Sequence, residues 1–277
     1  MKLGITTIQR NRGPWIVQWL AFHLMVGFDR FFFYAHKCSD DTIDILVKLQ
    51  RHYDITIHEL GDIEKPQLIA YKHAIDTYNH TVDWMALIDG DEFLFSPKHR
   101  DMKQALAEYA GRDLSALAVY WMCYGSNGHL EEPAGLLLEN YPRHSSRDFL
   151  INKHIKSIVR GGEHIAEGSS HYFVTSRGTF DERMRPITAG VTDYDPSYEV
   201  FRINHYVCQS YQYYVETKGP MGEADGDPNK VRGLSHFLNH DRNECDDGLA
   251  YNLLIPLKLK VRELQAVIDN ETGTWSR

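Results

Sequence analysis

The first third of the chain alternates strand-like and helix-like stretches, and this alternation restricts the fold more than any other feature. Four apolar runs rich in β-branched and aromatic residues predict strands, at residues 3–8, 30–35, 55–58 and 84–88. The stretches between them begin with helix-start signals, at Gly13-Pro14, Ser39-Asp40-Asp41 and Pro66. Because strands joined through helices run parallel, this order predicts an α/β fold whose parallel sheet has helices on both faces.

The pattern loosens after Asp101, where shorter elements and longer loops follow one another. We expect helices at 102–109 and 210–218, strands at 117–121, 154–160 and 200–206, and loops at 125–147 and 219–227. The last amphipathic stretch predicts a helix at 251–268, or one that begins only at Pro256. Packing of this helix on the domain is the main expectation, and docking to a membrane surface is the alternative.

Composition and charge exclude several classes of protein. The 277 residues are 43% hydrophobic and 12% aromatic, which suits a packed core and argues against disorder. A formal net charge of -8 argues against a nucleic-acid binder that relies on a general basic field. The four cysteines form no CxxC pair, so we expect free thiols in a reducing compartment. The start of the chain does not read as a signal peptide, and no apolar window reaches membrane-spanning length, which predicts a cytoplasmic protein.

An acidic turn, Asp89-Gly90-Asp91-Glu92, follows the fourth predicted strand directly. Carboxylates in apolar surroundings are costly unless a cation or hydrogen-bond donors meet them. In open α/β sheets, ligands bind beyond the carboxyl ends of the strands, where this turn lies. Mg²⁺ and Mn²⁺ accept carboxylate ligands and commonly complete their shell with phosphate oxygens. The turn therefore predicts a site for a metal-bound nucleotide diphosphate, and a solvated acidic turn is the alternative.

Three stretches together resemble a known family: ITTIQRNRGPWIVQWLAFHLMVGFDRFFFYAHKCSDDT, WMALIDGDEFLF and INHYVCQSYQYYVETKGP. Their order resembles that of the GT-A glycosyltransferases, most closely glycosyltransferase family 92 and its family-2-like bacterial relatives. The chain departs from the family pattern at three positions. Arg10 stands where the family often has lysine, and Arg12 and Gln18 stand where it has glutamate.

The resemblance implies a GT-A fold, a Rossmann-like nucleotide-binding domain with a mixed, mostly parallel central sheet, plus a C-terminal helical extension. The catalytic domain would span 1–220, with a donor half at 1–95 and an acceptor half at 96–220, and the extension would span 221–277. The implied activity is metal-dependent transfer of a hexose, galactose or glucose, from a UDP-sugar to a saccharide or glycolipid acceptor with inversion. Surface polysaccharide or lipopolysaccharide assembly at the inner face of a membrane would be its setting. The alternatives are a metal-dependent sugar nucleotidyltransferase and a non-catalytic sugar-binding relative.

The same resemblance implies roles for residues of the donor site. The nucleotide would be bound by Thr6, Thr7, Arg10, Asn11, Asp40, Asp89, Gly90 and Lys218. The metal would be held by Asp89, Asp91 and His205, where a neutral imidazole suits Mn²⁺ better than Mg²⁺. Purely structural roles are the alternatives for two of them, a helix cap for Asp40 and a core histidine for His205.

The base and the acceptor wall are the other implied parts of the site. GT-A inverting enzymes usually carry their base in a loop after a sheet strand, which here predicts Glu163, Glu167 or His171, with Asp181 and Asp193 as outside candidates. Trp121 and Tyr124 would contact the acceptor, because aromatic faces pack against sugar rings. Tyr124 is the better candidate of the two, since Trp121 reads equally well as a core residue.

Overall fold

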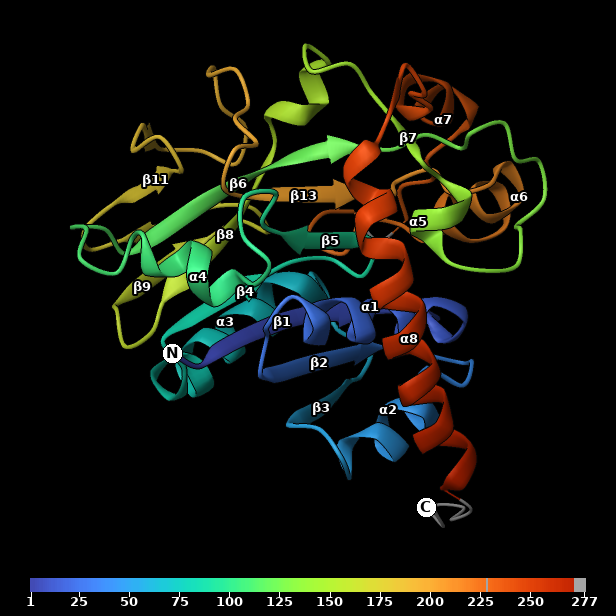
Figure 1. Ribbon diagram of the computed structural model, residues 1–277, viewed down its shortest axis with the longest axis horizontal. Coiled ribbons are helices and arrows are strands. Elements are labelled where there is room, and N and C mark those ends of the chain that lie inside the picture. Colours follow the sequence, from blue (N-terminus) through green and yellow to red (C-terminus); the bar gives the residue numbers. More distant parts are fainter. Residues whose placement is uncertain (228, 272–277) are drawn as a thin grey trace.

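A mixed sheet runs through the centre of the molecule (Figure 1). The computed structural model describes residues 1–227 and 229–271, leaving out the side chains of Glu167 and Ala250. Within that part, the main sheet consists of β1 (Leu3–Gln9), β2 (Arg30–His36), β3 (Ile55–Leu60), β4 (Trp84–Leu87), β5 (Glu92–Phe95), β6 (Ala116–Cys123), β8 (Ile155–Arg160), β11 (Thr179–Asp181), β12 (Pro186–Ile187) and β13 (Arg202–His205). Two small sheets pair β9 (Ile165–Gly168) with β10 (Phe173–Thr175), and β7 (Arg143–His144) with β14 (Cys245–Asp246).

The helices surround this sheet. They are α1 (Gly13–Met25), α2 (Thr42–Gln50), α3 (Pro66–Tyr78), α4 (Met102–Ala107), α5 (Leu137–Asn140), α6 (Tyr211–Tyr213), α7 (Leu234–His240) and α8 (Gly248–Asn270). Short 3₁₀ turns occur at η1 (Asn79–Thr81) and η2 (Leu150–Lys153), and η3 (Tyr214–Lys218) is a π-helical turn.

The predicted α/β class is confirmed. The main sheet has the order β12-β11-β6-β8-β4-β1-β2-β3, with β13 paired to both β5 and β6. Strands β3, β2, β1 and β4 run parallel to one another, as their alternation with helices predicts. Strand β8 is antiparallel to both β4 and β6, so the sheet is mixed.

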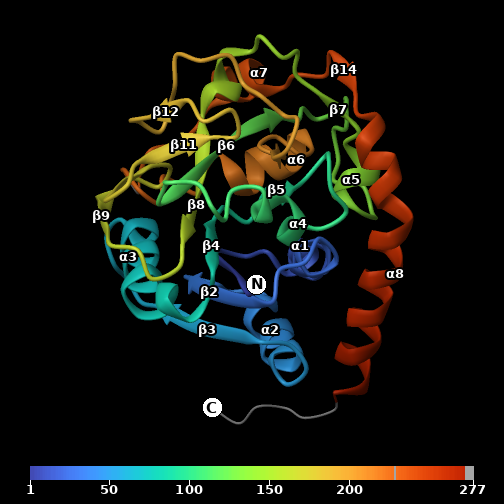
Figure 2. The same ribbon diagram turned by 60° about the vertical axis from the view of Figure 1, so that its left-hand side comes forward.

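The aromatic strand β2 supplies both faces of the sheet. Phe31 and Phe33 pack into the core that includes residues of α1, α2 and α8, whereas Phe32 and Tyr34 pack into the core beneath α3. Successive side chains of a strand point to opposite faces, so a run of aromatic residues is suited to a strand buried on both. Figure 2 shows α3 on one side of the sheet and α1, α2 and α8 on the other.

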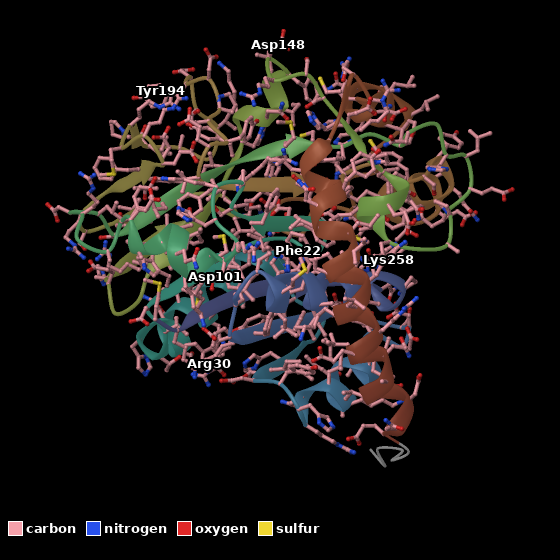
Figure 3. The ribbon with its side chains drawn as sticks, viewed as in Figure 1. Phe22, Arg30, Asp101, Asp148, Tyr194 and Lys258 are labelled. Atoms are coloured by element: carbon pink, nitrogen blue, oxygen red, sulfur yellow. The ribbon has the colours of Figure 1, made fainter. Side chains whose placement is uncertain are left out.

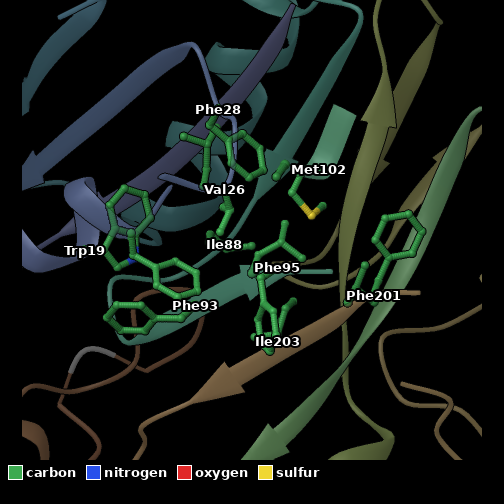
Figure 4. Packing of buried hydrophobic residues seen from close by; sticks show 14 of the residues in the cluster. Trp19, Val26, Phe28, Ile88, Phe93, Phe95, Met102, Phe201 and Ile203 are labelled. Atoms are coloured by element: carbon green, nitrogen blue, oxygen red, sulfur yellow. The ribbon is translucent and has the colours of Figure 1, made fainter. Parts of the chain in front are cut away.

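The core beneath α1 continues past the acidic turn. Phe22 of α1 packs edge-to-face with Phe93 and Phe95 of β5. Strand β5 pairs with β13 at Ile203, and Trp19 belongs to the same buried cluster (Figure 4). The indole nitrogen of Trp19 donates to the carbonyl oxygen of Glu92 at 2.9 Å. The turn is therefore fixed to the core on its outgoing side.

The C-terminal helix α8 is one continuous element, longer than the predicted 251–268 and with Pro256 inside it. It packs along α1, α2 and α5, and Leu257 and Leu264 are fully buried. Lys258 of α8 donates to Glu139 of α5 at 2.6 Å (Figure 3). The helix thus shares the main core, as expected for a helix that packs on the domain. Among the described residues, no helix combines the length and the apolarity that crossing a bilayer requires.

His23 is a polar residue in the middle of this core. It is fully buried on α1, where Nδ1 lies 2.8 Å from the carbonyl oxygen of Trp19 and Nε2 accepts from the backbone N–H of Leu94 at 3.2 Å. Burial lowers the pKa of His23 to about 3. The folded protein therefore holds this imidazole neutral, while the unfolded chain protonates it below about pH 6.5.

We predict that His23 makes the protein less stable in mild acid. Its stabilising contribution is complete above the unfolded pKa and is lost as the pH falls toward the folded value, because only the unfolded state takes up the proton. Between pH 7 and pH 5 this loss is roughly 2 kcal/mol of unfolding free energy. In His23→Gln, urea unfolding should therefore show a smaller fall in stability between these two pH values. The same substitution at the exposed His80 is the control, and equal falls in wild type and His23→Gln would contradict the prediction.

Candidate active site

A cavity of about 890 Å³ opens at the carboxyl ends of β1, β2 and β4. Its walls come from distant parts of the chain, at Arg10, Arg12, His36, Gln67, Asp89, Gly90, Asp91, Trp121, His154, His171, His205, Lys218, Asp225, Arg232, His236 and His240, among others. The carboxyl edge of a parallel sheet is the position expected for a ligand site in an α/β fold. The acidic turn, His205 and Lys218, predicted to lie together, all line this one cavity.

The acidic turn is shaped by close packing against the end of β1. A Cβ atom at Gly90 would lie 2.2 Å from Oε1 of Gln9, so a larger residue there would require the Gln9 side chain to move. Oε2 of Glu92 accepts from the backbone N–H of Asp89 at 2.9 Å and closes the turn. The two other carboxylates, Asp89 and Asp91, line the cavity.

Asp89 is held by three donors on one oxygen. Its Oδ1 accepts from Gln67 at 2.5 Å, from the hydroxyl of Tyr71 at 3.1 Å and from Nζ of Lys156 at 2.9 Å. Burial alone would raise the pKa of Asp89, but Lys156 brings it below its ordinary value. Asp89 is therefore ionised and fixed, and no hydrogen bond within the described chain occupies Oδ2.

Lys156 is the cation that sequence reasoning missed. It is 1% exposed, and its ammonium lies 3.0 Å from the carbonyl oxygen of Ser170 and 3.9 Å from Oε1 of Glu92. Burial raises the pKa of Glu92 well above its ordinary value, since that side chain is fully excluded from water. Lys156 thus compensates the buried side of the turn. The available signal was a lysine inside the strand predicted at 154–160.

Asp91 faces a second lysine and a histidine. Its side chain is 7% exposed, with Oδ2 at 2.5 Å from Nζ of Lys218 and Oδ1 at 3.8 Å from Nε2 of His205. Burial would raise the pKa of Asp91, but Lys218, His205 and Arg12 together lower it. Burial lowers the pKa of His205 to about 3, so its imidazole is neutral at physiological pH and able to bind a metal.

Pairing between strands explains how the late residues reach the turn. Strand β13 is antiparallel to β5, with His205 opposite Glu92, and parallel to β6, with His205 opposite Cys123. The chain then continues through α6 into the π-helical turn η3, which ends at Lys218. The predicted return of the 200–220 segment to the acidic turn is thus present in the fold.

Arg12 holds two walls of the cavity together. Its guanidinium donates to the hydroxyl of Tyr213 at 2.9 Å and to the carbonyl oxygen of Gly90 at 3.2 Å. It also lies over the ring of Trp15, 4.5 Å from the centroid. Arg10 donates to the carbonyl oxygen of Met221 at 3.2 Å. Both arginines therefore connect separate segments of the cavity wall.

Four of the residues predicted to bind the nucleotide do not line the cavity. Thr6 and Thr7 are buried within β1. The side-chain oxygen of Asn11 accepts from the backbone N–H of Ser39 at 2.8 Å. Asp40 accepts from the backbone N–H groups of Gly13 and Thr42, at 2.8 and 3.1 Å. Asn11 and Asp40 thus connect the loops after β1 and β2, which is the structural role considered for Asp40.

The structure contradicts the prediction of Glu163 as a base. Because β8 runs antiparallel to β4, the residues after Arg160 lie at the edge of the sheet away from the acidic turn. Glu163 there forms an ion pair with Arg177 and accepts from Ser115 and Ser176. The side chain of Glu167 lies outside the described residues, and neither Asp181 nor Asp193 lines the cavity.

His171 does reach the cavity, because the β9–β10 hairpin brings its tip back beside β8. Its Nδ1 lies 2.9 Å from the carbonyl oxygen of Ile155, an arrangement that leaves Nε2 as the basic nitrogen. Burial lowers the pKa of His171 to about 4. Beside it, the hydroxyl of Ser170 donates to Asp225, a cavity-lining carboxylate that sequence reasoning did not consider.

The two predicted acceptor residues have opposite environments. Trp121 lines the cavity and packs against three imidazole rings, with centroids 4.2 Å from His205, 4.9 Å from His154 and 5.1 Å from His171. Tyr124 is fully buried, and its hydroxyl is bonded to Asp247 and Arg202. The prediction that Tyr124 contacts an acceptor is therefore wrong.

The loop after η3 also forms part of the cavity wall, through residues 220–225. The backbone N–H of Gln67 donates to the carbonyl oxygen of Ala224 at 3.0 Å. A domain boundary placed after residue 220 would therefore divide the wall of the site. Within the described chain, no three His, Cys, Asp or Glu residues are grouped so that they alone could hold a metal ion.

Among solved structures, two similar to this chain match it at low sequence identity. TarS of S. aureus (residues 1–349) is 15% identical, with a TM-score of 0.38 over 58% of this chain and 47% of that one. Glucosyl-3-phosphoglycerate synthase of Mycobacterium tuberculosis, solved with Mn²⁺, UDP and phosphoglyceric acid, is 12% identical, with a TM-score of 0.30 over 43% of each chain.

Curated relatives are plant proteins. Glycosyltransferase family 92 proteins of Ricinus communis and Arabidopsis thaliana are each 26% identical, over 162 and 170 residues. Each match covers 57% of this chain but 28% of the relative, so the chain spans well under half the length of these proteins. The mixed α/β sheet agrees with the GT-A fold expected from the sequence. The sequence model of glycosyltransferase family 92 matches residues 5–227, and the chain belongs to this family.

Proposed function

We propose that this chain transfers a hexose, galactose or glucose, from a UDP-sugar to a saccharide acceptor in a metal-dependent reaction. The observation that carries the proposal is the convergence of Asp89, Asp91, His205 and Lys218 on one cavity at the carboxyl edge of the sheet. Carboxylates, a neutral imidazole and an ammonium are the groups that a metal-bound diphosphate requires.

The residues present fit a divalent cation that is shared with substrate. Asp91 and neutral His205 would supply two ligands, and the nitrogen ligand favours Mn²⁺ over Mg²⁺. Since no three His, Cys, Asp or Glu residues of the described chain are grouped so that they could hold the ion alone, diphosphate oxygens and water would complete the shell. A bound cation would offset the negative charge that develops on the diphosphate leaving group.

The remaining donor contacts follow from the free groups of the cavity. Asp89 has Oδ2 available for a ribose hydroxyl, because its other oxygen is saturated. Lys218 would bind the diphosphate as a point charge, with Arg10 and Arg232 on the same wall. The nucleoside would lie toward the ends of β1 and β2.

His171 is our candidate for the base of an inverting transfer. Its Nε2 belongs to a neutral imidazole, and Trp121 beside it would provide the apolar surface for an acceptor sugar. Asp225 is the carboxylate alternative on the same side of the cavity. We place the reaction in surface polysaccharide or lipopolysaccharide assembly, with a saccharide or glycolipid acceptor and the enzyme at the cytoplasmic face of the membrane.

We predict that Asp91→Asn abolishes metal-dependent release of UDP from a UDP-sugar. The variant keeps the shape of the side chain but removes the charge that would bind the cation, so the rate should fall by about 100-fold or more. The measurement is nucleoside diphosphate release from a panel of nucleotide sugars with Mn²⁺ or Mg²⁺. Asp76→Asn, on the outer side of α3, is the control.

Three results would contradict this function. If the wild type shows neither metal-dependent release of nucleoside diphosphate nor metal-dependent nucleotide binding, the transferase proposal is rejected. Pyrophosphate release from a nucleoside triphosphate and a sugar phosphate would identify a nucleotidyltransferase instead. Binding of the nucleotide sugar without turnover, in the presence of a panel of saccharide acceptors, would favour a non-catalytic sugar-binding protein.

We further predict that His171→Gln lowers kcat by roughly 100-fold to 10,000-fold, the range for loss of a general base. UDP binding should stay close to that of the wild type, because His171 lies on the acceptor side. Asp225→Asn tests the alternative base in the same assay. Glu163→Gln should keep its activity, since Glu163 lies at the opposite edge of the sheet. A large loss in Asp225→Asn with an active His171→Gln would reassign the base.

A further inference from the structure

Asp89 and Asp91 of the acidic turn are paired with lysines of different exposure. Asp89 faces Lys156, a strand residue that is 1% exposed and fixed by two hydrogen bonds. Asp91 faces Lys218, whose side chain is 18% exposed and lines the cavity. One ion pair is therefore part of the buried frame, while the other lies on the open wall of the site.

Lys218 is bonded to one oxygen of Asp91, next to the oxygen that a divalent cation would share with His205. Nζ of Lys218 lies 2.5 Å from Oδ2, and His205 lies on the side of Oδ1. The ammonium of Lys218 forms an ion pair with this carboxylate. A divalent cation held by Asp91 and His205 would stand directly beside this charge in a partly buried site, where repulsion is strong.

We propose that Lys218 is an internal counterion that makes metal binding depend on donor binding. This inference rests on the proposed metal site at Asp91 and His205. Lys218 competes with the cation for Asp91 until a diphosphate offers its ammonium another anionic partner. The donor thus draws Lys218 away from Asp91, and the carboxylate becomes available for the cation. Each ligand thereby strengthens the binding of the other.

The backbone around Lys218 is suited to a change of the side chain alone. Lys218 ends the π-helical turn η3, whose last residues are followed by Gly219. The guanidinium of Arg232 donates to the carbonyl oxygen of Gly222 at 2.7 Å, and the N–H of Gly219 donates to Tyr214 at 2.7 Å. These bonds hold the main chain, while the flexible four-carbon side chain of lysine can move its charge across the cavity.

The test measures Mn²⁺ binding to the full chain by titration calorimetry and by electron paramagnetic resonance of free Mn²⁺, with and without UDP. We expect UDP to strengthen Mn²⁺ binding to the wild type by about tenfold or more, within the usual range of coupling between sites. In Lys218→Met, Mn²⁺ alone should bind about tenfold more tightly than to the wild type, and UDP should add much less. Lys218→Gln should behave in the same way if Lys218→Met folds poorly.

Matched variants distinguish a failure of this inference from a failure of the proposed metal site. Lys230→Met removes one positive charge from the loop that follows η3. In the wild type Lys230 pairs with Glu223 and not with Asp91, so this variant should bind Mn²⁺ like the wild type. Lys218→Arg keeps the charge and should not strengthen binding of Mn²⁺ alone. Unchanged or weaker binding of Mn²⁺ alone in both Lys218→Met and Lys218→Gln would overturn the inference, provided that Asp91→Asn abolishes binding. Binding that survives Asp91→Asn would overturn the proposed metal site itself.

Discussion

The structure depends on compensation of the acidic turn by cations that come from distant parts of the chain. Asp89, Asp91 and Glu92 sit between the buried strands β4 and β5, where an uncompensated carboxylate would cost several kcal/mol. Lys156 reaches the turn because β8 inserts between β4 and β6. Lys218 reaches it because β13 pairs with β5 and β6 before the chain turns into η3. The acidic turn can therefore be buried because β8 and β13 bring these two lysines to it.

This dependence also explains what the sequence could and could not predict. The four parallel strands and their helices follow from local periodicity and helix-start signals, which each short segment carries by itself. The run 154–160 was equally visible as a strand, but its direction is set by its partners in the sheet. Because β8 proved antiparallel, its lysine faces the acidic turn while Glu163, after its end, lies far from it. Because the direction of this strand could not be predicted, the role of Lys156 was missed and Glu163 was wrongly predicted as a base.

The aromatic residues at the end of β6 also show that contacts distant in the sequence decide the role of a side chain. Trp121 and Tyr124 were equally aromatic candidates for an acceptor wall, and the better candidate by sequence was the wrong one. The hydroxyl of Tyr124 is taken by Arg202 and by Asp247, the residue that caps α8. That contact joins the end of β6 to the start of the C-terminal helix. A partner more than a hundred positions away, which no local pattern records, thus decides that Tyr124 is structural.

The charges along the cavity wall favour a ligand that carries both positive and negative charge. Lys156, Lys218 and Arg12 already lie beside Asp89 and Asp91, so the two carboxylates are compensated before any ligand arrives. A divalent cation alone would add positive charge beside Lys218, and a diphosphate alone would add negative charge beside Asp91. A cation bound to a diphosphate is nearly neutral as a unit and offers each member of the Lys218–Asp91 pair a new partner of opposite charge. The arginine at position 12 adds to this balance, since a glutamate there would leave the turn with more negative charge and would bind a free cation more readily.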